Sequence, residues 1–228
     1  MKKMILFLFI VSVSFLYAKD PNIILDKVKN KLNKVNDYSV DITIDVNADF
    51  VQMPPRKAQV FFKKPEKMRI KSDGFAILPK QGINFSPVKF LNNEYDAIYI
   101  KSEKLNSTQV DVIKIIPRSD SSEITLATVW VDEVNNIIRK IEAVTNRGGA
   151  FTMQFDYSSF IKWGLPDKMV FSFSIKGMRI PNMAPENIDD KKEMINPKNV
   201  DGEVIVKYFN YKINKGIDDK IFNDDVKK

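Results

Sequence analysis

The chain contains no cysteine and no histidine among its 228 residues. Without cysteine it can form neither a disulfide framework nor a thiolate metal site. Without histidine it lacks the commonest general base, the usual base of a serine triad and the main zinc ligand. The absence of both residues excludes most types of hydrolase and metalloenzyme active site. We expect a protein that is not an enzyme, with no catalytic residue, no metal site and no cofactor.

Glycine and proline are also scarce, with 8 and 11 residues, which excludes a low-complexity linker protein. The hydrophobic share of 44% and the charged share of 29% are typical of a globular protein. The length suits one large domain or two small ones, and all-β folds often reach it as a single unit. Because there is no internal repeat and no second composition regime, we predict one domain.

A concentrated charge of one sign is missing as well. The net charge is +7, or +5 once Lys2 and Lys3 are removed, and it is spread along the chain. With no basic stripe interleaved with aromatics, we expect no nucleic-acid partner. Asp41, Asp45 and Asp49 share one face of a predicted strand. They could suggest a Ca²⁺ site or a glycosidase pair, but their spacing favours a solvated outer face.

The longest apolar run lies at the N-terminus. Lys2 and Lys3 precede an almost unbroken apolar stretch from Met4 to Tyr17, and Ala18 ends it. This pattern predicts a secretory signal peptide over residues 1–18, cleaved near Ala18. The alternative is a membrane anchor, but the stretch is shorter than the roughly 20 residues that a spanning helix needs. The mature product is expected to be exported.

The mature chain begins with a pattern typical of one amphipathic helix, followed by strands. Apolar residues recur at steps of three and four from Ile24 to Val35, after Pro21. Period-two alternation then predicts a strand from Val40 to Phe50, a turn at Met53–Pro55, and two short strands around Ala58–Phe62 and Met68–Ile70. Further strands are predicted at Ala97–Lys101, Val110–Ile116, Ile124–Val131, Ile137–Thr145, Phe151–Tyr157, Met169–Ile175 and Val204–Tyr211, with a short helix at Ser86–Phe90.

Turns directly between strands indicate hairpins, and hence antiparallel pairing. A sheet of this size must curl or close. Each strand has an apolar face, yet only one clear helix is available to cover these faces. The sheet therefore either closes round a packed core or curves round an apolar hollow. We predict an α+β fold: a large curved antiparallel sheet, or incomplete β-barrel, with helices covering its concave apolar face. The polar stretch 179–202 is predicted to be an insertion loop.

Several segments, in their order, resemble the LolA-type periplasmic carriers of outer-membrane lipoproteins. They are KVNDYSVDITI (34–44), VFFKKPEKMRI (60–70), WVDEVNNIIRKIEA (130–143), GGAFTMQFDY (148–157), LPDKMVFSF (165–173) and YFNYKINKGIDDKIF (208–222). Two features depart from the family pattern. Lys64 stands where the best-known carriers have an arginine that bonds the helical lid, and the family's Pro-rich C-terminal segment is absent.

The resemblance implies an incomplete barrel whose hollow takes up the acyl chains of lipoproteins or lipids. It implies a monomeric carrier in the periplasm that receives its cargo from an inner-membrane ABC transporter and delivers it to an outer-membrane acceptor. The same fold also occurs in lipid- or lipoprotein-sensing domains that act on a membrane regulator. This second reading stays open at this point.

Flexible methionines and large aromatics suit a hollow that must repack around variable acyl chains. The same residues would also serve an ordinary packed core. The predicted lining residues are Val40, Ile42, Ile44, Val60, Phe62, Met68, Ile70, Trp130, Met153, Phe155, Phe171 and Phe173. The side of the sheet on which Trp130 lies is left open, because its strand is apolar on both faces.

The opening helix carries the predicted cover of this hollow. Leu25, Val28 and Leu32 are predicted to form a lid over its mouth, although a permanently docked helix would show the same stripe. Lys64 and Arg69 are predicted to latch that lid or to contact an anionic headgroup; the alternative for both is plain surface.

Overall fold

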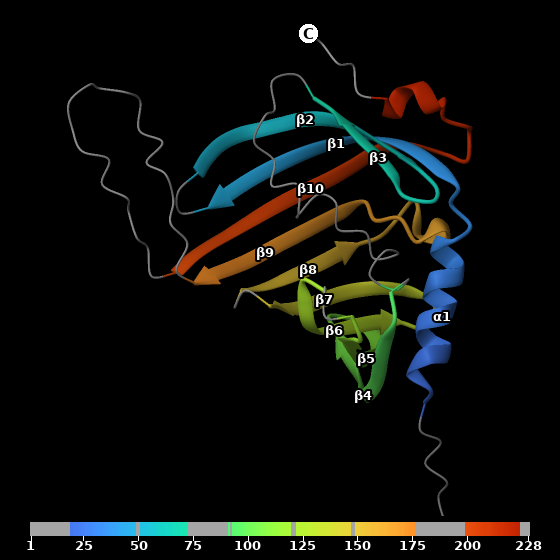
Figure 1. The fold of residues 1–228 in the computed structure, drawn as a ribbon, viewed down its shortest axis with the longest axis vertical. Coiled ribbons are helices and arrows are strands. Elements are labelled where there is room, and N and C mark those ends of the chain that lie inside the picture. The colour runs from blue at the N-terminus through green and yellow to red at the C-terminus, as the bar shows by residue number, and fades with distance from the viewer. Residues whose placement is uncertain are drawn as a thin grey trace, which may run out of the picture.

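The computed structural model describes residues 19–48, 51–72, 91, 93–119, 122–146, 149–176 and 199–223. Almost all of these residues belong to one antiparallel sheet (Figure 1). The elements are α1 (Pro21–Leu32), β1 (Asp37–Ala48), β2 (Val51–Lys63), β3 (Lys67–Lys71), β4 (Tyr95–Leu105), β5 (Thr108–Pro117), β6 (Ile124–Asp132), β7 (Ile137–Thr145), β8 (Ala150–Asp156), the 3-10 turn η1 (Ile161–Trp163), β9 (Lys168–Lys176), β10 (Asn199–Ile213) and the 3-10 turn η2 (Asp219–Phe222).

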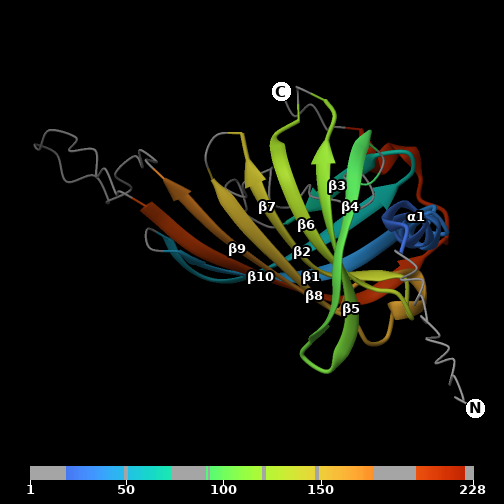
Figure 2. The same cartoon turned by 90° about the horizontal axis from the view of Figure 1, so that it is seen from below.

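The ten strands follow the order β3-β2-β1-β10-β9-β8-β7-β6-β5-β4, with every neighbouring pair antiparallel. From β4 to β10 each strand pairs with the next in the chain, and β1 then joins β10. The two edge strands, β3 and β4, lie at opposite ends of the sheet (Figure 1), and the sheet curves into an open half-barrel (Figure 2). The predicted large curved antiparallel sheet is confirmed.

The helix α1 begins where the sequence offers a cap. The Asp20 side chain accepts a hydrogen bond from the Asn22 amide at 2.8 Å, and Pro21 occupies the first helical position, where no amide hydrogen is needed. Ile24, Leu25 and Val28 are buried against the concave face of the sheet. The helix ends at Leu32, one turn before the predicted end at Val35.

The two faces of the sheet are packed differently. The concave face carries the main core, which includes Ile44, Ile113, Ile141 and Met153 together with the buried side of α1. On the convex face a much smaller cluster contains Val110, Val112 and Trp130, with Leu105 beside it. Trp130 points away from the concave side because its neighbours Val129 and Val131 both point into it. The hollow of the sheet and Trp130 therefore lie on opposite faces.

The predicted turn at Met53–Pro55 is wrong, because β2 runs straight through these residues. The register jumps from Ile44 opposite Arg56 to Val46 opposite Met53, so Pro54 and Pro55 lie in a β-bulge. At this point β3 does not pair with β2, and a bulge in an edge-like stretch is where a strand tolerates residues without an amide hydrogen.

Three predicted segments lie outside the described residues: the signal peptide 1–18, the helix Ser86–Phe90 and the part of the polar insertion that spans 179–198. The last four residues of that insertion are not a loop. Asn199–Gly202 form the beginning of β10 and pair with β9 from Lys176 to Phe173.

Candidate functional site

A cavity of about 340 Å³ lies between the concave face of the sheet and the C-terminal half of α1. Its floor is apolar and comes from six strands, β3, β2, β1, β10, β9 and β8, which are adjacent in the sheet although some are distant in sequence. The floor residues are Ile42, Ile44, Val60, Phe62, Met68, Phe155, Met169 and Val206. Their common orientation follows from the two-residue period of the strands, which sends every second side chain to the same face.

The roof of the cavity consists of α1 and the segment that follows it. Val28 and Leu32 face the cavity from the helix, and Val35 faces it from the connection to β1. The η1 loop closes the side, where Gly164 has φ +70° and a Cβ atom would meet Leu32 Cδ2 at 3.1 Å. Gly164 thus permits both the left-handed backbone and the close approach of this loop to α1.

Four tyrosines add polar tips to the apolar lining: Tyr38, Tyr157, Tyr208 and Tyr211. The Tyr157 hydroxyl donates to the Ile138 carbonyl at 2.8 Å, and the Tyr211 hydroxyl donates to the Pro166 carbonyl at 3.1 Å. The Tyr208 hydroxyl is 3.9 Å from the sulfur of Met169, which is a weak acceptor. No described residue forms a hydrogen bond with the Tyr38 hydroxyl.

Burial controls the ionisation of these phenols. It raises the pKa of Tyr38 to about 12 and raises the pKa of Tyr157, Tyr208 and Tyr211 as well. All four hydroxyls therefore stay protonated at neutral pH and can donate hydrogen bonds. The rings pack on one another, with Tyr38 stacked on Phe62 at 5.2 Å between centroids and Tyr208 stacked on Tyr211 at 6.1 Å. The site combines an apolar interior with fixed hydroxyl donors.

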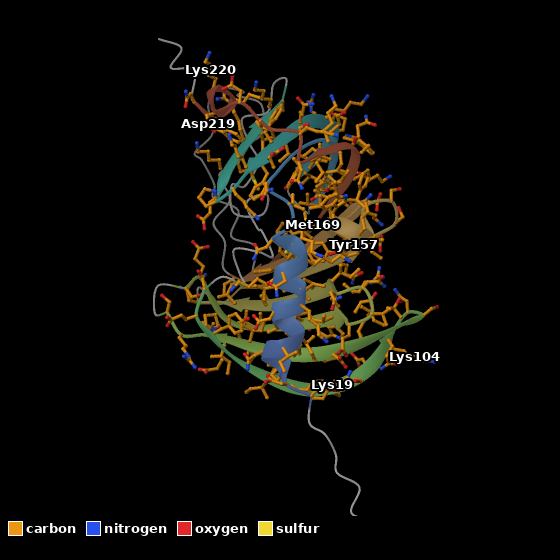
Figure 3. The ribbon with its side chains drawn as sticks, turned by 90° about the vertical axis from the view of Figure 1, so that its right-hand side faces the viewer. Lys19, Lys104, Tyr157, Met169, Asp219 and Lys220 are labelled. Atoms are coloured by element: carbon orange, nitrogen blue, oxygen red, sulfur yellow. The ribbon has the colours of Figure 1, made fainter. Side chains whose placement is uncertain are left out.

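The N-terminal end of α1 is anchored by Lys19 (Figure 3). Its Nζ lies 2.7 Å from Asp111 Oδ2 on β5 and 2.8 Å from Glu133 Oε2 in the turn between β6 and β7. The Asp111 side chain is only 2% exposed and also accepts a hydrogen bond from the Ser102 hydroxyl. Burial alone would raise the pKa of Asp111, but the hydrogen bonds from Lys19 and Ser102 outweigh it and hold this pKa below its usual value.

Two further lysines attach the side of α1 to the same turn. Lys27 Nζ lies 3.3 Å from Glu133 Oε1, and Lys31 Nζ donates to the Asn135 carbonyl at 2.6 Å. Since Lys27 and Lys31 are four residues apart, they lie on the same side of the helix. Together with Lys19 they fix the helix along its length to the turn 133–136.

The C-terminal end of α1 is held by Lys64. Its Nζ donates to the carbonyl of the C-cap residue Asn33 and to Asn36 Oδ1, the latter at 3.3 Å. Lysine near a helix C-terminus is favourable because the ammonium satisfies the last carbonyls and meets the negative end of the helix dipole. Lys64 therefore occupies a latching position. Arg69 does not, because its guanidinium donates to the Asn223 carbonyl near η2.

The predicted lining residues are placed in three groups. Ile42, Ile44, Val60, Phe62, Met68 and Phe155 line the cavity. Val40, Ile70, Met153 and Phe171 belong to the packed part of the same core and do not line it. Phe173 contacts Phe171 with 5.7 Å between centroids, farther along the sheet, and Trp130 lies on the convex face. Of the predicted lid, Val28 and Leu32 line the cavity, whereas Leu25 is completely buried between α1 and the sheet.

Several residues of the site were not anticipated from the sequence. Tyr38 and Tyr208 continue the apolar alternations of β1 and β10, so the strand pattern alone predicts that their side chains face the concave side. Lys19 and Asp111 are 92 residues apart, and nothing local connects them. Lys27 and Lys31 showed a helical spacing, but the turn that they contact was not predictable from it.

A second, shallower depression of about 530 Å³ lies at the far ends of β1, β8, β9 and β10. Most of its side chains are polar and share the convex face, since they alternate with the concave-face residues Phe151 and Phe173. Those polar residues are Asn47, Thr152, Ser172, Ser174, Asp201 and Glu203. This depression does not enlarge the apolar cavity.

Within the described residues no group of acidic side chains is arranged to hold a metal ion. The same part of the chain contains no helix with the length and apolar character needed to traverse a lipid bilayer.

Comparison with solved structures shows the same architecture in other proteins. A LolA superfamily protein from Nitrosomonas europaea has a TM-score of 0.57 and 15% identity, covering 91% of this chain and 99% of that one. A DUF1329 family protein from Desulfovibrio piger has a TM-score of 0.59 and 11% identity, covering 90% of this chain and 98% of that one. A putative outer membrane lipoprotein-sorting protein domain from Vibrio parahaemolyticus has a TM-score of 0.54 and 13% identity, covering 87% of this chain and 95% of that one. No family model matches the chain, and no curated protein matches its sequence. The chain has a divergent LolA-like fold.

Proposed function

We propose that this protein is a periplasmic carrier that binds acyl chains of lipoproteins or lipids in the cavity beneath α1 and moves them towards the outer membrane. The observation that carries the proposal is the largely apolar, partly open cavity of about 340 Å³ under a helix that is fastened at both ends. Each methylene group transferred from water to such a cavity contributes about 0.8 kcal/mol. Acyl chains therefore bind there without any covalent step.

Transfer in this proposal follows from differences in affinity between successive partners. An inner-membrane ABC transporter would supply the cargo, and an outer-membrane acceptor would receive it. The expected export signal at residues 1–18 supports a location outside the cytoplasm. A monomer is sufficient, because a helix of the same chain covers the cavity.

The test is saturable binding of a fluorescent fatty-acyl probe to the delipidated mature chain, residues 19–228. Val60→Trp is the informative variant, because Val60 lines the cavity and a larger side chain fills it without burying a charge. Excluding two or three methylenes, each worth about 0.8 kcal/mol, weakens binding about tenfold or more.

Val144→Trp is the matched control. Val144 is 45% exposed and lies on the face opposite to its buried neighbour Ala143, so the same substitution there leaves the cavity intact. Equal binding by the two variants, or no saturable binding by the unmodified chain, would refute the proposed function.

A further inference from the structure

The volume of the cavity limits the number of chains that it can hold. A dry cavity of about 150 Å³ accommodates benzene, a molecule of six carbons. On this scale a cavity of about 340 Å³ has room for about fourteen carbons, which is one acyl chain of moderate length. The remaining concave core near α1 is filled, since Leu25, Ile113, Ile141 and Met153 are fully buried. Two or three parallel chains do not fit the hollow that the described residues enclose.

The charge of the cavity lining is positive only. Lys64 is the single charged side chain among the described residues that line the cavity. Its ammonium meets the Asn33 carbonyl and the Asn36 amide oxygen, and no carboxylate of the described chain forms a salt bridge with it. The helix C-terminus offers about half a negative charge, which leaves part of the lysine's charge unbalanced. The third N–H of this ammonium can donate a charge-assisted hydrogen bond to an anion.

Hydroxyl donors accompany this cation. Tyr38 stacks on Phe62 near the end of β2, and Lys64 directly follows that strand. All three residues line the cavity, so the Tyr38 ring lies at the same end as Lys64. The Tyr38 hydroxyl has no hydrogen-bond partner in the described chain, and Tyr208 has only the distant sulfur of Met169. Both can donate to the oxygen of a ligand. The acidic residues Asp201 and Glu203 lie at the other end of the sheet, on the convex depression.

From the cavity volume, the unbalanced charge of Lys64 and the Tyr38 hydroxyl, which no described residue engages, we infer that the ligand is a single-chain anionic amphiphile. Its one acyl chain lies under α1, and its carboxylate or phosphate is bound by Lys64 and Tyr38. This inference rests on the proposed acyl-binding function and narrows it to one chain with one anionic headgroup.

The experiment is calorimetric titration of the mature chain with four probes of equal chain length. They are laurate, methyl laurate, dilauroyl phosphatidylglycerol and a lipopeptide with three lauroyl chains. We expect one laurate per protein and weaker binding of the two-chain and three-chain probes. Dodecyl phosphate, added as a fifth probe, distinguishes a carboxylate site from a site that prefers phosphate.

The variant Lys64→Gln separates headgroup binding from lid latching. Glutamine keeps a donor for the Asn33 carbonyl but removes the charge, so laurate binding falls about tenfold while methyl laurate binding stays within about twofold. Lys64→Arg restores laurate binding. Lys57→Gln, at an exposed position on β2, also removes one positive charge and should change the binding of neither laurate nor methyl laurate.

The possible results distinguish the headgroup site, the single acyl chain and the carrier function from one another. An equal loss of laurate and methyl laurate in Lys64→Gln would show that Lys64 only latches the helix, and would overturn the headgroup site. Tighter binding of the three-chain lipopeptide than of laurate would overturn the single-chain inference and leave the carrier function standing. If none of the probes binds, the proposed function itself is wrong.

Discussion

The ion pair between Lys19 and Asp111 provides the sharpest test of how α1 is held on the sheet. Asp111 is 2% exposed and depends on Lys19 for its counter-charge, whereas the Lys19 side chain is 43% exposed and can be partly hydrated. Breaking a fully buried pair costs 3–5 kcal/mol, and the hydration of Lys19 reduces this to about 2 kcal/mol. For a chain of this size that corresponds to a drop of about 4–8 °C in Tm for Lys19→Gln.

The matched control is Lys27→Gln. Lys27 is on α1, two turns after Lys19, and contacts the same Glu133 at 3.3 Å, but both side chains of this pair are substantially exposed. Exposed pairs contribute little, so Tm should fall by less than about 2 °C. Both variants remove one positive charge, and differential scanning calorimetry on residues 19–228 measures both. Equal shifts for Lys19→Gln and Lys27→Gln would refute the argument from burial.

The pH dependence of the Tm difference between the unmodified chain and Lys19→Gln tests the same ion pair, and its direction can be predicted. The pKa of Asp111 is depressed in the folded protein, so the stability that it contributes is present above its unfolded pKa of about 3.9. This stability is lost as the pH falls further, through the folded pKa. The Tm difference between the unmodified chain and Lys19→Gln should therefore be constant from pH 7 to pH 5 and shrink towards pH 3. A difference that persists unchanged at pH 3 would contradict the ion pair as its cause.

Three other substitutions test the core, the buried charges and the face assignment. Leu25→Ala removes a fully buried side chain beneath α1 and should cost about 3 kcal/mol in urea unfolding; a loss below about 1 kcal/mol would mean that α1 is not docked there. Arg139→Gln removes the cation 2.8 Å from Asp132, whose side chain is 1% exposed, and should cost about 3 kcal/mol in thermal unfolding at pH 7. Trp130→Phe should leave acyl-probe binding within about twofold, because Trp130 is on the convex face; a tenfold loss would place the ligand elsewhere.

The strand pattern could be predicted because strand orientation is local. Val40, Ile42 and Ile44 alternate with polar residues, and the structure places all three on the concave face. The same pattern could not show which part of that face is filled. Val40 is packed whereas Ile42 lines the cavity, and the difference depends on where α1 crosses the sheet. That position is set by contacts such as Lys19 with Asp111, 92 residues apart.

Two errors have a physical origin in the sheet itself. Pro54 and Pro55 read as a turn, since proline ends most strands, but a bulge removes the need for their amide hydrogens. Trp130 could not be assigned to a face because its strand is apolar on both sides. The convex cluster of Val110, Val112 and Trp130 supplies the second apolar environment, and the indole nitrogen finds an acceptor in Glu103 at 2.6 Å.

The two ends of α1 differ in what must be broken to lift them. At the N-terminal end, Leu25 is completely buried and Lys19 holds an almost inaccessible carboxylate. At the C-terminal end, Leu32 is half-buried over a cavity, and Lys64 contacts neutral oxygens at the surface. Lifting the last turn therefore breaks only the bonds of Lys31 and Lys64 to neutral oxygens and uncovers apolar area that already borders the cavity. Lifting the N-terminal half costs both a packed leucine and a buried ion pair. Access of an acyl chain to the cavity is cheapest beside Leu32, next to the lysine that is proposed to bind its headgroup.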